Sequence, residues 1–160
     1  YIDRLIVSVA AKMGLRAGEI SNMKASDIDG DRLHIRGKGD DDRTVTIPRS
    51  VQLMLETYVQ IAPYSVEGDA YIFQSFWRGE YHRMSEKTIW KRVKNVFMRV
   101  CSVDTWPHAL RHSYAIDLLM KGCDIVTVQK SLGHTDIEIT QIYLDIAQDL
   151  VAKQIHKYIS

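Results

Sequence analysis

The sequence predicts a mainly helical domain with one small antiparallel β-sheet. Several segments carry apolar residues at the three- and four-residue spacing of an amphipathic helix. Between residues 32 and 48, two short strand-like runs flank a connection rich in Gly and Asp, which is the pattern of a β-hairpin. The chain has 160 residues, of which 46% are hydrophobic and 26% charged. This balance suits a single globular domain, 1–160, with one core.

The first part of the chain is expected to form helices around the hairpin. Apolar spacing predicts a helix over residues 2–13, and Gly14 fits its C-terminal cap. Within the hairpin, the strand-like runs are "LHI" and "TVTI", and Pro48 ends the second. The elements expected around the hairpin are a short helix within residues 16–29 that closes in a turn at 27–30, and a helix that starts at Ser50 and runs to 62.

The second part is expected to be helical after an irregular stretch at 63–83, in which "YIFQS" is a brief extended piece. Ser85 is a favourable N-cap for a helix over 85–101. Further helices are expected at 106–122, which ends at Gly122, at 124–133, which ends at Gly133, around Tyr143, and in an amphipathic tail over 149–160.

Several classes of protein are not expected. No run of about 18 apolar residues exists that could span a membrane, and no secretory leader is visible. The start "YIDRL" is interpreted as the first helix of a domain cut from a longer protein. Cys101 and Cys123 match no zinc pattern and are expected to be reduced thiols in the cytoplasm. We expect neither a metal nor a cofactor.

The helix predicted over 85–101 has a basic face with two interpretations. Its basic residues are Lys87, Lys91, Arg92, Lys94 and Arg99. Few acidic residues lie nearby in the sequence to balance them. A solvated helix face and contact with the DNA backbone are both compatible with this pattern.

Candidate phosphate ligands lie at helix ends and in loops. His108 and Arg111 are three residues apart near a helix N-terminus, so both side chains can reach one anion. Arg16 lies between two helices, and Glu19 could hold its guanidinium by a bidentate contact. Lys38 is expected at the hairpin tip. Each of these residues, taken alone, is better explained as an ordinary solvated side chain.

His134 and Tyr143 raise the question of a nucleophile. Nine residues separate them, so they would face opposite sides of a continuous helix, and Gly133 instead predicts a corner. Taken alone, Tyr143 could be a core aromatic residue.

Together, the motifs "GLRAGEI", "GKG", "HALRH", "LGH" and "TQIY" resemble the tyrosine recombinases, the phage integrase family. The resemblance runs from Arg16 to Tyr143 and implies the DNA breaking-rejoining fold. It also implies a site-specific DNA recombinase that needs neither ATP nor a metal. The motif "YLDIAQD" departs from the family pattern, because Asp145 stands where many relatives have histidine.

The resemblance implies a role for each matching residue. The two arginines that clamp the phosphate would be Arg16, supported by Glu19, and Arg111. The remaining implied roles are a general acid at Lys38, a general base at His108, a phosphate donor at His134 and the nucleophile at Tyr143.

The resemblance also implies partners and a longer protein. We expect double-stranded DNA as partner, a tetramer held on DNA by the tail after Tyr143, and association with the nucleoid. The N-terminal core-binding domain of the family is absent from this chain. The alternatives are a type IB topoisomerase and a catalytically silent DNA-binding module of the same fold.

Overall fold

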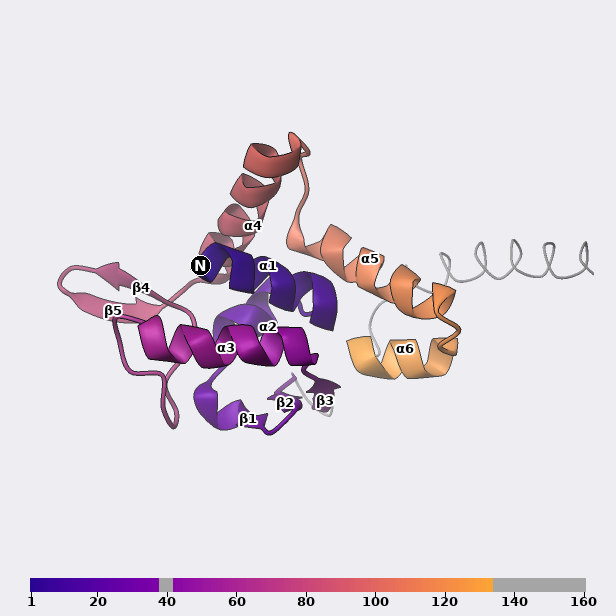
Figure 1. The fold of residues 1–160 in the computed structure, drawn as a ribbon, viewed down its shortest axis with the longest axis horizontal. Helices are drawn as coiled ribbons and strands as arrows, with labels where there is room; N and C mark the ends of the chain where they lie inside the picture. Colours follow the sequence, from indigo (N-terminus) through magenta and orange to yellow (C-terminus); the bar gives the residue numbers. More distant parts are fainter. Residues whose placement is uncertain (38–41, 134–160) are drawn as a thin grey trace, which may run out of the picture. The chain divides into compact units, whose positions relative to one another are not determined.

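The computed structural model describes residues 1–37 and 42–133, and its chain divides into two compact units. The first unit is Tyr1–Tyr114 and the second is Ala115–Ser160. Figure 1 shows the elements that open the chain: α1 (Ile2–Met13), α2 (Ala17–Asn22), a 3-10 turn (Ala25–Asp27), β1 (Ile28–Asp29), β2 (Arg32–Ile35) and β3 (Arg43–Thr46). The elements that follow are α3 (Arg49–Ile61), β4 (Gln74–Trp77), β5 (Glu80–Arg83), α4 (Glu86–Cys101), α5 (Pro107–Met120) and α6 (Ile125–Leu132). The expectation of a mainly helical fold with antiparallel strands is confirmed.

Helix α1 lies at the centre of the first unit's core. Leu5, Val9 and Met13 recur every four residues on one face and are fully buried. This face packs against α3 and α4. The helix ends where sequence predicted, because Gly14 adopts the left-handed conformation, with φ 64°, that a C-terminal cap favours.

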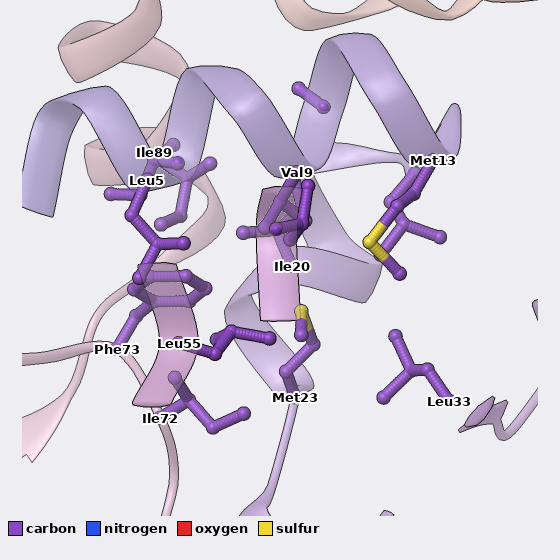
Figure 2. Packing of buried hydrophobic residues seen from close by; sticks show 14 of the residues in the cluster. Leu5, Val9, Met13, Ile20, Met23, Leu33, Leu55, Ile72, Phe73 and Ile89 are labelled. Carbon is purple, nitrogen blue, oxygen red and sulfur yellow. The ribbon is translucent and has the colours of Figure 1, made fainter. Parts of the chain in front are cut away.

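The core contains side chains from the helices and the three-stranded sheet of the first unit. In Figure 2, Ile20 of α2, Leu55 of α3 and Ile89 of α4 lie around the buried face of α1, together with Phe73. Burial of one such side chain contributes roughly 1.5–3 kcal/mol. Packing therefore holds α1 and α2, which frame the residues discussed below.

The predicted hairpin, β2 and β3, forms two strands of a three-stranded antiparallel sheet. Strand β2 is central, with β1 on one side and β3 on the other. Leu33, Ile35 and Val45 face the core, whereas the residues between them face solvent. The pairing of Ile35 with Arg43 is the last one before the connection between the two strands.

The short helix expected within 16–29 stops early. It ends at Asn22, and Ile28–Asp29 forms strand β1 where a turn was expected. The cause is tertiary, because the backbone carbonyl of Met23 accepts a hydrogen bond from Ile72 N at 2.9 Å. This pairing with a distant segment draws the chain out of the helix.

A second hairpin occupies part of the stretch 63–83 that was expected to be irregular. Strands β4 and β5 pair around a turn at Arg78 and Gly79, which both have positive φ. Such a two-residue turn suits a hairpin, but it is usually signalled by Asn-Gly. The strands are also largely exposed, so they lack the alternating apolar pattern by which strands are recognised. The expectation of one sheet was therefore wrong, since the described residues contain two.

Helix ends in the rest of the chain follow their predicted caps, with one exception. The Ser85 hydroxyl accepts a hydrogen bond from Thr88 N at the start of α4, and Gly133 caps α6. Ser50 does not cap α3, which begins after Pro48. Its hydroxyl instead accepts a hydrogen bond from Lys12 Nζ at 2.9 Å. Among the helices that the structure describes, none is both long and apolar enough to cross a lipid bilayer.

Candidate functional site

Arg16 is held at a corner between two helices. It follows the buried Leu15 and is the N-cap residue of α2. The Glu19 carboxylate folds back onto it, with Oε2 accepting from the Arg16 backbone N at 2.8 Å and Oε1 from Nη1 at 3.2 Å. The expected Arg16–Glu19 contact is therefore present, although it uses one guanidinium nitrogen and the backbone. The Arg16 side chain remains 34% exposed, so it can still meet a ligand.

Arg111 reaches the same corner from α5. Its side chain is only 1% exposed, and its Nη1 donates to the Gly14 carbonyl oxygen at 2.7 Å. The same Nη1 lies 4.0 Å from Glu19 Oε2. Arg16 and Arg111, which are far apart in sequence, thus meet at one carboxylate.

Sequence reasoning missed a third arginine in this cluster. Arg43, the first residue of β3, is 9% exposed and binds Glu19 with both terminal nitrogens: Nη2 lies 2.9 Å from Oε2 and Nη1 lies 2.9 Å from Oε1. Such a fork-to-fork pair is the strongest geometry for arginine and a carboxylate. The signal for it was weak, since Arg43 is one of several basic residues with no motif of its own.

Glu19 is consequently a largely buried carboxylate that stays ionised. Burial by itself raises the pKa of Glu19. This effect is outweighed by the hydrogen bond and charge of Arg43, the backbone N–H of Arg16 and the charge of Arg111, so the pKa is lowered below 4.5. The described part of the cluster therefore carries three guanidinium charges and one carboxylate charge, an excess that favours an anion.

His108 lies in the first turn of α5, one turn before Arg111, and is exposed. Its ring meets the ring of His112 edge to face, with the centroids 4.5 Å apart. The i, i+4 spacing on α5 produces this contact. His112, which sequence reasoning did not single out, therefore restricts the orientation of the candidate base.

Three predicted site residues lie outside the described residues: Lys38, His134 and Tyr143. Their roles stay predictions. Among residues 1–37 and 42–133, no group of His, Cys, Asp or Glu side chains could hold a metal ion.

The basic face of α4 is partly neutralised, which corrects the expectation that few acids balance it. Asp3 of α1 pairs with Arg92 at 2.5 Å and lies 3.8 Å from Arg99, and Asp104 pairs with Lys94 at 2.8 Å. Lys87 and Lys91 are exposed and form no ion pair within the part of the chain that the structure describes. They are the remaining candidates on α4 for phosphate contact.

The chain is similar to proteins of a known family. Residues 1–149 match the phage integrase family. The chain belongs to this family. A tyrosine recombinase, XerA, from Pyrococcus furiosus is 36% identical over 144 residues, which are 88% of this chain and 49% of the relative.

Solved structures of recombinases share the fold. The crystal structure of a XerA recombinase matches 94% of this chain and 56% of its own, with a TM-score of 0.77 and 33% identity. The XerH recombinase, solved in a post-cleavage complex with its palindromic difH substrate, matches 89% of this chain and 41% of its own, with a TM-score of 0.68 and 24% identity. The chain spans about half the length of the curated relatives it matches.

Proposed function

We propose that this chain is the catalytic domain of a site-specific DNA recombinase. In the proposed reaction, the Tyr143 phenol attacks a DNA phosphate and forms a covalent 3′-phosphotyrosine, which releases a 5′-hydroxyl. A 5′-hydroxyl from another strand then attacks this intermediate and restores the phosphodiester. The bond energy is conserved in the covalent intermediate, so the reaction needs no ATP.

The observation that carries the proposal is the arginine cluster at Glu19. Arg16 and Arg111 both lie within 4.0 Å of one buried carboxylate, and Arg16 remains partly exposed. Charge develops on the nonbridging oxygens of a phosphate during transfer, and planar guanidinium groups fixed in advance complement that charge. Loss of one such donor typically lowers the rate by about 10²–10³.

The remaining roles follow from the acid–base chemistry of the step. A tyrosine with a pKa of about 10 is only about 0.1% ionised at pH 7, so the nucleophile needs a base or a cationic site. We assign His108 as the base and the two arginines as the cationic site. Lys38 would protonate the leaving 5′-oxygen, and His134 would donate a hydrogen bond to the phosphate.

We extend the proposal to the whole protein. It would contain a further N-terminal DNA-binding domain, since the chain spans about half of the relatives' length. It would act on double-stranded DNA as a tetramer held together by the tail after Tyr143. The DNA-bound state of XerH, a protein of the same fold, supports DNA as the substrate.

The test is covalent capture with the full-length protein. A nicked suicide substrate releases a short fragment after cleavage, so the covalent adduct accumulates and is resolved on a denaturing gel. Wild type is expected to form the adduct, and Tyr143→Phe, which lacks only the hydroxyl, is expected to form none. Absence of an adduct with wild type would contradict the proposal.

The same assay separates recombination from strand relaxation. A recombinase should exchange strands between two matching sites, whereas relaxation of supercoils without site preference would favour the topoisomerase alternative. No observation on this chain favours that alternative.

A further inference from the structure

We propose that Arg43 is a positioning residue that holds Glu19 in place, and through it aims Arg16 at the scissile phosphate. This inference rests on the proposed function. It assigns Arg43 no contact with the DNA. Arg43 would act entirely through the carboxylate that Arg16 and Arg111 share.

The contacts explain why Arg43 is not itself a phosphate ligand. Both of its terminal nitrogens lie 2.9 Å from a Glu19 oxygen, and its side chain is 9% exposed. The Arg16 guanidinium, by contrast, contacts Glu19 through Nη1 at 3.2 Å, and the Arg16 side chain is 34% exposed. The more buried arginine thus holds both oxygens of the carboxylate, and the side chain of the other arginine is more accessible to a ligand.

The Arg43–Glu19 pair affects how strongly Glu19 competes with a phosphate for the other two arginines. A carboxylate beside a phosphate site competes with the phosphate for the same guanidinium groups. Because Arg43 engages both oxygens of Glu19, the carboxylate can orient Arg16 without neutralising it fully. Without Arg43, Glu19 would form stronger ion pairs with Arg16 and with Arg111, whose Nη1 is 4.0 Å away. Both phosphate ligands would then be partly occupied.

The substitution should also change the pH dependence of cleavage. The charged groups that face Glu19 are Arg16 on its own helix, Arg43 from β3 and Arg111 from α5, and the Glu86 carboxylate of α4 lies against the neighbouring Gly18. Burial raises the pKa of Glu19, and Arg43 opposes this effect. Removal of Arg43 should therefore raise the pKa of Glu19. The carboxylate would then take up a proton at a higher pH, and the acidic limb of the pH–rate profile would shift to higher pH.

The experiment measures single-turnover cleavage of the suicide substrate by the full-length protein, with DNA affinity measured in parallel. Arg43→Gln is expected to lower the cleavage rate about 10²-fold, as a small misplacement of a catalytic group does. The DNA Kd and its salt dependence should stay unchanged, because no phosphate contact is lost. Arg43→Lys, which keeps the charge but not the fork, should recover part of the rate. Thermal unfolding of each variant shows whether it is folded.

A double-mutant comparison decides how Arg43 acts. If it acts through Glu19, Arg43→Gln should cost little more once Glu19→Gln is present, and the raised acidic limb should disappear. A full-sized loss in the Glu19→Gln background, or a reduced salt dependence of binding, would overturn the inference. If wild type cleaves and a folded Arg43→Gln variant cleaves at the same rate, the inference about Arg43 is overturned and the proposed function stands. Absence of an adduct with wild type would overturn the proposed function as well.

Discussion

Glu19 is the residue on which the arginine cluster depends. Its carboxylate accepts hydrogen bonds from Arg16 and from both arms of Arg43, and it is largely buried. A buried charge is tolerated only when it is paired and hydrogen-bonded, so the cluster loses its organisation if the carboxylate is neutralised. The same residue therefore links the stability of the domain to the geometry of the site.

Replacement of Glu19 by Gln should lower the stability of the domain in a pH-dependent way. The folded pKa of Glu19 lies below its ordinary value of 4.5, so the unfolded chain binds the proton first as the pH falls. The stabilisation is thus complete above about pH 5 and is lost as the pH falls through the folded pKa. Urea unfolding at pH 7 should show Glu19→Gln less stable by about 1–3 kcal/mol.

The difference between the two proteins should shrink when the unfolding is repeated below pH 4.5. Exposed Glu56 provides the matched control, because Glu56→Gln removes a surface ion pair with Arg49 that is worth little. A pH-independent difference for Glu19→Gln would contradict the link between its charge and stability.

At the scale of elements, helix α4 shows how packing redistributes charge. Its buried face, which includes Ile89 and Val93, packs in the core, and its Arg92 pairs with Asp3 of α1. This pairing belongs to the contact between two helices. The basic face inferred from the sequence is therefore reduced to its exposed residues near the start of the helix.

Removal of charge at Lys87 and Lys91 should weaken DNA binding by the full-length protein. Each lost phosphate contact should reduce the slope of log K against log salt by about 0.9. The measurement is a salt titration of DNA affinity for Lys87→Gln and Lys91→Gln. Lys94→Gln is the control, because Lys94 already pairs with Asp104 and should change the slope less. Equal slopes for all of these proteins would show that α4 is a solvated helix face.

At the scale of the whole molecule, the first unit contains the core and the described arginine cluster. The cluster is framed by α1, α2 and the three-stranded sheet, all of which contribute to one set of buried side chains. The second unit, Ala115–Ser160, includes His134 and Tyr143 in its sequence.

The core of the first unit should respond strongly to truncation at Phe73. This side chain is fully buried beside Tyr58, so Phe73→Ala should lower the free energy of unfolding by about 3–5 kcal/mol. Phe76, three residues later in β4, is 62% exposed, and Phe76→Ala should cost about 1 kcal/mol or less. Urea unfolding of both variants checks this contrast. Similar losses at the two positions would contradict the burial pattern.

The sequence by itself determined most of the described helices and their caps, and it indicated the residues of the candidate site. Gly14, Ser85 and Gly133 end or begin helices as predicted because capping depends on the few residues next to each helix end. Arg16 and Arg111 were predicted as phosphate ligands because their motifs resemble those of the phage integrase family. The β4–β5 hairpin was missed because its exposed strands leave no apolar alternation, and its Arg-Gly turn lacks the usual signature.

Only the tertiary structure decided which charges meet. Arg43 binds Glu19 across 24 positions of sequence, and Arg92 binds Asp3 across 89. Pairs of this kind leave no local or periodic pattern in the sequence. The first depends on how β3 lies against α2, and the second on how α4 packs against α1. For that reason the sequence indicated a pair of phosphate-binding arginines, whereas the fold added the buried arginine that holds their shared carboxylate.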